Sequence, residues 1–253
     1  AHYSMGGIFV NPENLSTSVE GLFAVGEVAG GLHGANRLGG NSLAEIIIFG
    51  RRAGIAASKY SRNIDQQMRS NKAIAIAHEN INKFIKNGNE LVRPLQNELR
   101  LIMWKYCGVI KNETLLLEGL SKIERIKSKL SDIDVRIDQY NCEDLALIFD
   151  LQSSLFSAKS TIVSALQRNE SRGAHQRSDF PLLDPLFQFN CVVSMDDDNN
   201  SDDEHGHSHG YDLSMTRYQL LSFCSRMTSK ACVPIDPVEP STATPLVGAS
   251  NSG

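Results

Sequence analysis

A glycine-rich loop that leads directly into a helix constrains this chain most. Residues 32–43 read Leu-His-Gly-Ala-Asn-Arg-Leu-Gly-Gly-Asn-Ser-Leu. The first backbone N–H groups of a helix lack partners inside the helix, so such a start favours an anionic or electron-rich ligand. Arg37 stands inside the loop, where its guanidinium suits two-pronged binding of a carboxylate. The residues alone therefore predict an anion- or cofactor-binding loop, and they leave a purely structural helix start open.

The segments around this loop predict a small mixed unit. Residues 8–10 and 21–27 are short apolar runs of the kind that form strands, and the second run ends in a glycine turn. A helix is expected over residues 43–60, with residues 41–42 as its cap. The sequence contains no GxGxxG, so this unit lacks the dinucleotide fingerprint.

Residues 62–186 predict a second, helical unit. Apolar residues at helical spacing indicate helices over 73–85, 115–130 and 141–166, and Pro94 suits the first residue of another. The third of these stretches carries apolar residues on a wide face, which indicates a buried helix. Amphipathic helices in succession are typical of a small bundle, which is a packing unit.

The last part of the chain changes character. Alternating apolar residues on both sides of a polar stretch predict a β-hairpin over 187–217, and a tail rich in Pro, Ser, Thr and Gly over 218–253 is expected to be disordered. The tip of the hairpin holds His205, His207 and His209 beside acidic residues. These could bind zinc or copper adventitiously, but nothing fixes their geometry, so we interpret them as a solvated loop and assign no metal site.

The charge and the cysteines exclude several classes of function. The chain of 253 residues has 25 Lys and Arg against 29 Asp and Glu, a net charge of −4, so we expect neither nucleic acid nor an anionic membrane as a partner. No apolar run approaches the ~20 residues of a transmembrane helix. The five cysteines are scattered and form no CxxC, which argues against a cluster-binding site or a disulfide framework in this chain.

Several motifs in order resemble one known family. His2-Tyr3-Ser4-Met5-Gly6-Gly7, the Gly21–Glu27 run, the 32–43 loop and the Ser171-Arg172-Gly173-Ala174-His175 motif are similar to segments of the succinate dehydrogenase and fumarate reductase flavoprotein subunits. L-aspartate oxidase belongs to the same superfamily. The resemblance covers roughly residues 1–195. It implies an α+β fold in which residues 1–61 are the C-terminal portion of a Rossmann-like FAD-binding domain, followed by the helical domain, the hairpin and the tail.

The resemblance implies a bound C4 dicarboxylate, succinate or fumarate. His2 and Arg37 would each hold one of its carboxylates, and the backbone N–H of Gly40 would reach the same carboxylate as Arg37. Hydride transfer to or from flavin N5 requires a substrate fixed at both ends, and Arg37 would also stabilise charge that builds up during the reaction. Without the motif, His2 would be a surface residue and Arg37 a solvated cation.

The resemblance also implies FAD as cofactor. Glu27 would accept hydrogen bonds from the FAD ribose, although its plain alternative is the capping of a turn. Asn41, Ser42 and Leu43 would contact the flavin from the helix start, where a positive dipole end stabilises the negative charge of reduced flavin. For His33 a structural role is favoured over donation to substrate, and Arg172 and His175 are expected to pin the helical unit onto the first unit.

The chain begins Ala-His-Tyr-Ser, directly in a motif, so we expect it to be the C-terminal part of a longer protein. The family's FAD pyrophosphate fingerprint, its covalent-attachment histidine and the arginine of its cap domain do not occur here, and the fragment is expected to be inactive alone. An iron–sulfur electron-transfer subunit is a candidate partner. Two alternatives stay open: an L-aspartate oxidase, and a truncated non-catalytic structural or binding module. Cytoplasmic, mitochondrial and plastid locations all stay open.

Overall fold

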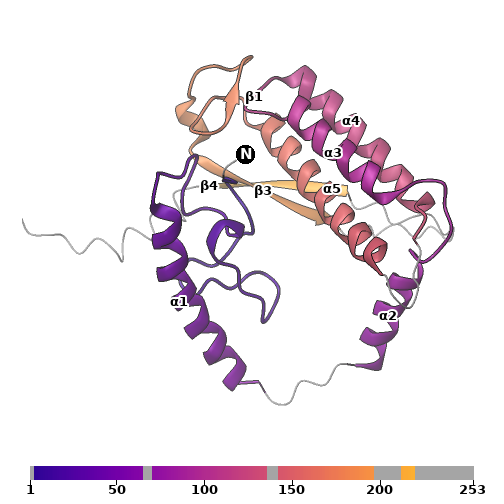
Figure 1. The fold of residues 1–253 in the computed structure, drawn as a ribbon. Helices are drawn as coiled ribbons and strands as arrows, with labels where there is room; N and C mark the ends of the chain where they lie inside the picture. The colour runs from indigo at the N-terminus through magenta and orange to yellow at the C-terminus, as the bar shows by residue number, and fades with distance from the viewer. Residues whose placement is uncertain (1–2, 65–69, 136–141, 197–211, 220–253) are drawn as a thin grey trace, which may run out of the picture.

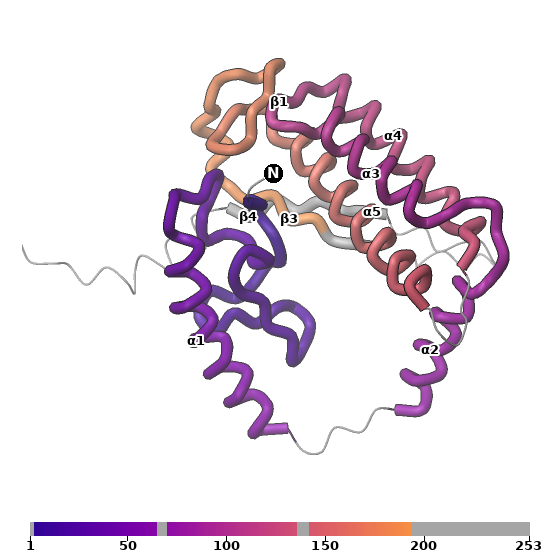
Figure 2. The backbone as a smooth tube through the Cα atoms, viewed as in Figure 1, coloured from indigo at the N-terminus to yellow at the C-terminus, as the bar shows by residue number. Residues whose placement is uncertain are grey.

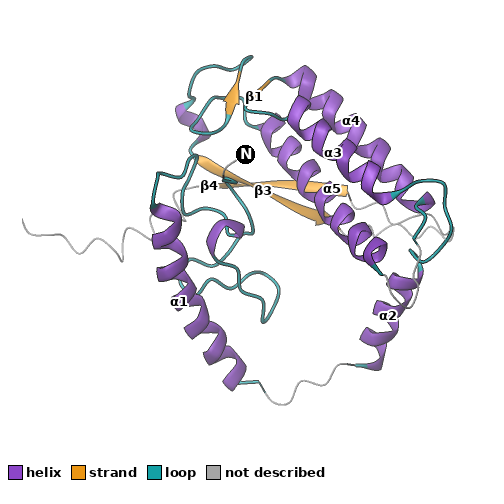
Figure 3. Ribbon diagram, viewed as in Figure 1, coloured by secondary structure: helices purple, strands orange, loops and turns teal. Residues whose placement is uncertain are grey.

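The chain forms two units that meet at one end (Figures 1 and 2). The computed structural model describes residues 3–64, 70–135, 142–196 and 212–219. The first unit, drawn in indigo, consists of loops around one long helix, and the second contains the helices drawn in magenta to salmon (Figure 1). Helices, short strands and loops are mixed as the α+β expectation requires (Figure 3).

The first unit has less sheet than the sequence predicts. The runs 8–10 and 21–27 do not form strands among the described residues; each makes one isolated bridge, to Ala29 and to Ser16 respectively. Gly26, at a φ of 80°, turns the chain into a 3-10 helix, Gly26–Val28. The expectation of two strands is therefore wrong for this chain. A strand needs a continuous hydrogen-bonded neighbour, and neither run finds one among the described residues.

Helix α1, Asn41–Arg62, begins two residues before the expected start. Its N-cap is Gly40, in the left-handed conformation at a φ of 82°, and no side chain caps it by a hydrogen bond. The expected capping by residues 41–42 is therefore wrong. Glycine adopts this conformation without the steric penalty that a Cβ atom brings, so the turn itself sets the start of the helix.

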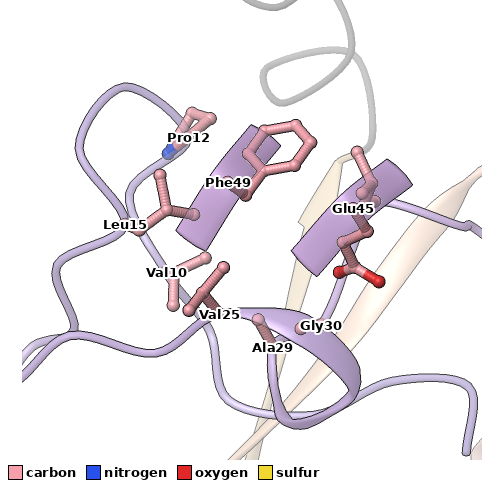
Figure 4. Close-up of a pocket in the computed structure, with 10 residues that line it drawn as sticks. Val10, Pro12, Leu15, Val25, Ala29, Gly30, Glu45 and Phe49 are labelled. Atoms are coloured by element: carbon pink, nitrogen blue, oxygen red, sulfur yellow. The ribbon is translucent and has the colours of Figure 1, made fainter. Parts of the chain in front are cut away.

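A small apolar core holds α1 against the loops. Ala53 is buried with Val10, Leu15 and Ala24, and Phe49 packs partly buried beside them. Figure 4 shows Phe49 reaching from α1 toward Val10 and Leu15, with a small pocket between the helix and the loops. Other apolar side chains of α1 face outward and are exposed: Leu43, Ile46, Ile47 and Ile48.

The second unit confirms the predicted helices, with ends shifted by a few residues. They are α2 Asn71–Asn82, α3 Val92–Tyr106, α4 Glu113–Lys129 and α5 Glu143–Gln167. Helices α3, α4 and α5 pack on one another, whereas α2 buries none of its residues. The bundle core consists of buried apolar residues from these three helices and the segment that follows α4: Val92, Leu95, Leu99, Ile102, Tyr106, Leu116, Ile123, Ile126, Ile133, Val135, Ile148, Leu151, Leu155, Ala158, Ile162 and Ala165.

Two polar side chains define the start of α4. The Asn112 side chain accepts a hydrogen bond from the Leu115 N–H at 2.9 Å and so caps the helix. The Asp179 carboxylate accepts one from the Glu113 N–H at 2.8 Å. Just before α4, β1 (Ile110–Lys111) pairs in parallel with β2 (Gln176–Arg177). The loop after α5 is thus fastened to the beginning of α4.

The predicted hairpin is present. Strands β3, Phe189–Asp196, and β4, Asp212–Gln219, pair antiparallel, and β3 contacts α5. The histidine-rich tip, the residues between the two strands, and the expected disordered tail from residue 220 lie outside the described residues. Within the described part of the chain, no cluster of His, Cys, Asp or Glu could hold a metal ion. No helix in that part is both long and apolar enough to cross a membrane.

A buried arginine, Arg177, donates a hydrogen bond to the C-terminal end of α5. Arg177 is 2% exposed, and its NH1 donates to the carbonyl of Ala165 at 2.7 Å, which satisfies a carbonyl in the last turn of the helix. Its other nitrogens donate to both oxygens of Asp179 at 2.7 Å. This bidentate hydrogen bonding by Arg177 holds the pKa of Asp179 well below its usual range.

We predict that Asp179→Asn lowers the free energy of unfolding by about 2 kcal/mol at neutral pH, because it leaves the buried guanidinium of Arg177 without its carboxylate. A lowered folded-state pKa means that this contribution is fully present above about pH 4 and is lost as the pH falls further. Urea denaturation from pH 7 to pH 2 checks both points. Equal slopes of stability against pH for Asp179→Asn and the parent chain below pH 4 would contradict the prediction.

The two units meet through a glycine turn. The Ala174 N–H donates to the carbonyl of Ala35 at 2.9 Å. Gly173 has a φ of 57°, and a Cβ atom placed on it would lie 2.4 Å from that same carbonyl oxygen. Only glycine fits this position, because the backbone of the helical unit contacts the backbone of the loop that contains Arg37.

We predict that Gly173→Ala destabilises the junction by about 2 kcal/mol or more, because the new methyl group meets backbone atoms in a conformation that disfavours a side chain. Gly50→Ala is the matched control. Gly50 lies inside α1 with open space around it, so an alanine there is expected to be neutral or stabilising. Thermal unfolding of both variants, monitored by circular dichroism, tests the prediction; equal unfolding temperatures would refute it.

Candidate functional site

The guanidinium of Arg37 is the centre of the candidate site. Its Cζ lies 4.3 Å from the centre of the Tyr3 ring, and its NH1 donates to the carbonyl of Leu38 at 3.2 Å. The Arg37 backbone N–H donates to Met5 Sδ at 3.2 Å. The Nε is buried and has no hydrogen-bond partner among the described residues. A buried donor without a partner is costly, so an oxygen atom of a ligand would be bound favourably here.

The turn after Arg37 exposes backbone rather than side chains. A Cβ atom placed on Gly34, Gly39 or Gly40 would meet no described atom within 4 Å. Asn41, Ser42 and Leu43 follow as the first turn of α1. Because no described side chain caps this 22-residue helix by a hydrogen bond, its positive end is suited to an electron-rich group.

Glu27 presents an exposed carboxylate from the short 3-10 helix. Its Oε1 accepts a hydrogen bond from the Ser4 N–H at 2.8 Å. Glu27 is thereby tied to the segment that follows His2. His2 itself lies outside the described residues, so the pairing of His2 with Arg37 remains a prediction.

The sequence did not point to Glu45, a buried carboxylate that contacts Tyr3 beside Arg37. Glu45 is 4% exposed, and its Oε2 accepts from the Tyr3 hydroxyl at 2.9 Å and lies 2.8 Å from His33 Nε2. Burial and this hydrogen bond raise the pKa of the Tyr3 phenol, which remains a neutral donor. The available signal was a single acid, Glu45, inside an otherwise apolar run at 43–49.

His33 contacts Glu45 rather than an open surface, in agreement with the structural role favoured for it. Arg172 and His175 make their described side-chain hydrogen bonds within the second unit, so the expectation that they pin this unit onto the first remains a prediction. Arg172 donates to the fully buried Glu170 from two nitrogens, at 2.7 and 2.9 Å, and His175 Nε2 lies 3.0 Å from the carbonyl of Arg168. Burial lowers the pKa of His175.

The residues present fit one side of a flavin and of an anionic substrate. An uncapped helix start, an exposed carboxylate at Glu27 and a glycine turn with open space around it are donors and acceptors of the kind that FAD requires. The partnerless Nε of Arg37 is suited to a carboxylate.

Comparison with known proteins gives two family matches. The fumarate reductase flavoprotein C-terminal family matches residues 96–216, and the FAD binding domain family matches residues 1–43. Among curated proteins, a chain of the fumarate reductase (CoM/CoB) from Methanothermobacter marburgensis is 37% identical over 77% of this chain and 35% of its own length. The fumarate reductase flavoprotein subunit of Haemophilus influenzae is 34% identical over 79% of this chain and 34% of its own length.

Solved structures agree with these matches. The Sdh1 complex of Mycobacterium smegmatis matches with a TM-score of 0.74 and 31% identity, over 86% of this chain and 36% of that one. The quinol fumarate reductase of E. coli matches with a TM-score of 0.74 and 29% identity, over 87% and 37%. The chain spans about a third of the length of the curated relatives it matches. The FAD binding domain match indicates FAD as cofactor, and this chain belongs to the fumarate reductase and succinate dehydrogenase flavoprotein family.

Proposed function

We propose that the complete polypeptide that carries this sequence is an FAD-dependent oxidoreductase that interconverts succinate and fumarate. In this proposal, residues 1–61 complete the FAD-binding domain, residues 62–186 form the helical domain, residues 187–217 form the hairpin and residues 218–253 form a tail. The chain supplies one wall of the active site and is inactive alone. The buried, partnerless Nε of Arg37 within the glycine loop is the observation that carries the proposal.

Arg37 binds one carboxylate of the dicarboxylate. The Arg37 backbone N–H is bonded to Met5 Sδ, and its guanidinium lies over the ring face of Tyr3, so little side-chain freedom is lost when substrate binds. A planar fork of N–H donors holds a carboxylate in one orientation. The Gly40 backbone N–H would assist at the same carboxylate, because no described atom lies within 4 Å of a Cβ built on this glycine.

His2 binds the other carboxylate in this proposal. Tyr3, the next residue along the chain, contacts Arg37, which supports a joint role for the two motifs. Two fixed ends hold a C4 molecule in a single position, and such alignment accounts for a large part of enzymatic rate enhancement.

FAD would be held by Glu27 and by the start of α1. The Glu27 carboxylate accepts hydrogen bonds from the ribose hydroxyls, and Asn41, Ser42 and Leu43 offer the positive end of the helix to the flavin ring. When bound, FAD supplies a two-electron donor or acceptor beside the substrate. The helix end stabilises negative charge without reorganisation, because its dipole is already fixed.

Two further points of the proposal rest on the relatives. L-aspartate oxidase of Acinetobacter baylyi is 32% identical over 73% of this chain and 32% of its own length, so aspartate is the alternative substrate. Several relatives are named flavoprotein subunits, which supports assembly with an electron-transfer subunit that carries iron–sulfur clusters.

We predict that Arg37→Ala in the complete polypeptide lowers kcat/KM for fumarate about 100- to 1,000-fold, because the carboxylate loses its charged, two-pronged partner. The flavin content, read from the visible absorbance, is expected to stay the same. Reoxidation of the dithionite-reduced protein by fumarate measures the rate, and aspartate-dependent reduction of the oxidised protein identifies the alternative substrate.

Arg52→Ala serves as the matched control for this experiment. Arg52 lies on α1 and donates to the carbonyls of Pro12 and Glu13 at 3.2 and 2.9 Å, away from Arg37. It is expected to lower stability without a change in kcat/KM. Loss of flavin with unchanged dicarboxylate affinity in Arg37→Ala would refute the role given to Arg37.

We predict that Glu27→Gln weakens FAD binding roughly 10-fold, because a neutral amide accepts hydrogen bonds less strongly than a carboxylate. The dissociation constant of FAD, measured by flavin fluorescence after removal and return of the cofactor, tests this. Glu13→Gln, an exposed acid in the same unit, is the control. Equal FAD affinities for Glu27→Gln and the control would mean that Glu27 only holds the Ser4 turn.

A further inference from the structure

The buried carboxylate of Glu45 is linked to Arg37, the proposed substrate-binding residue, through Tyr3. Glu45 lies in the first turns of α1, and Figure 4 shows its side chain among the apolar groups that line the small pocket. A buried charge is tolerated only when it is hydrogen-bonded. Tyr3 and His33 provide the two contacts, at 2.9 and 2.8 Å, and both reach the same oxygen, Oε2.

These contacts determine the position of the Tyr3 ring. The Glu45 oxygen that accepts from the Tyr3 hydroxyl also lies 2.8 Å from His33 Nε2, so one carboxylate joins the two rings. The His33 ring also meets the Tyr3 ring edge to face, with centres 5.7 Å apart and planes at 76°. The Tyr3 ring is therefore fixed at its hydroxyl by Glu45 and along its side by His33.

The ring face that remains carries the Arg37 guanidinium, with Cζ 4.3 Å from the ring centre. An aromatic face attracts a cation and restricts its movement to the space above the ring. Because α1 carries Glu45, and the loop before α1 carries both His33 and Arg37, this arrangement joins the N-terminal motif to the glycine loop.

We propose that Tyr3, Glu45 and His33 form a positioning set that fixes the direction of the Arg37 guanidinium toward the substrate carboxylate. This inference rests on the proposed function of Arg37. The three residues do not contact the substrate; they act through Arg37. A carboxylate bound by a guanidinium with the wrong direction would place the reacting carbon atoms off their required position, and an error of about 1 Å costs roughly 100-fold in rate.

The test uses the complete polypeptide with FAD bound, and it combines Tyr3→Leu with Arg37→Ala in a double-mutant cycle. Tyr3→Leu removes the ring face and is expected to lower kcat/KM for fumarate roughly 10- to 100-fold. In the Arg37→Ala background the same change is expected to have less than about a 2-fold effect, because residues that act through one another are not additive. The dissociation constant of succinate, measured by titration calorimetry, is expected to follow the same pattern.

Tyr60→Leu is the matched control. Tyr60 lies on α1 and packs against the Phe23 ring, with centres 6.2 Å apart. It is expected to reduce the unfolding temperature and to leave kcat/KM unchanged. If Tyr3→Leu fails to fold, Tyr3→Phe and Glu45→Gln take its place; each keeps the shape of the cluster and is expected to raise KM about 3-fold or more.

The outcomes separate the two proposals. If Arg37→Ala has no effect on kcat/KM or on succinate affinity, both the proposed function and the positioning set are wrong. If Arg37→Ala is harmful but Tyr3→Leu causes the same loss in both backgrounds, only the positioning set is wrong. Unchanged KM in both Tyr3→Phe and Glu45→Gln would overturn it as well.

Discussion

The buried carboxylate of Glu170 is the centre around which the chain after α5 folds. It is fully buried, and it accepts hydrogen bonds from Arg172, Arg168 and the Asp184 N–H. Although burial alone would raise it, these donors hold the pKa of Glu170 below its usual value. The chain after α5 therefore folds back around one charge, and this fold presents the Gly173 turn to the first unit. Without this charge, two partly buried guanidinium groups would lack their carboxylate partner.

The helices of this chain could be predicted because each of them carries its own signals. The Asn112 cap, Pro94 in a first turn and the apolar stripe that buries Leu116, Ile123 and Ile126 are local features, and the bundle follows from them. The two strands expected before residue 28 do not form in the part of the chain that the structure describes, and no local signal in the sequence could show this. An apolar run becomes a strand only beside a partner, and the identity of that partner is not a property of the run itself.

The site shows the same division. Arg37 and the glycine turn could be proposed from the sequence, because they combine unusual residues at close spacing. The start of α1 at Asn41 was misjudged, since the left-handed glycine before it, Gly40, can begin a helix without a capping side chain. Tyr3 and Glu45 were missed, because their contact joins positions 42 residues apart and neither residue type is unusual alone. A single acid within an apolar helical run is the signal that should prompt a search for buried partners.

The loop around Arg37 is thus linked through its neighbours to two buried carboxylates, Glu170 and Glu45. Glu170 binds Arg172, which lies in the turn whose Ala174 N–H donates to the Ala35 carbonyl. Glu45 accepts from the Tyr3 hydroxyl, and the Tyr3 ring contacts the guanidinium of Arg37. Glycines would leave such a loop free to move, with a large loss of entropy on binding. The contacts of the two carboxylates order the loop during folding, so this entropy is not lost again when a ligand binds. A glycine-rich backbone can then approach a ligand closely and still present one charged group in a fixed direction.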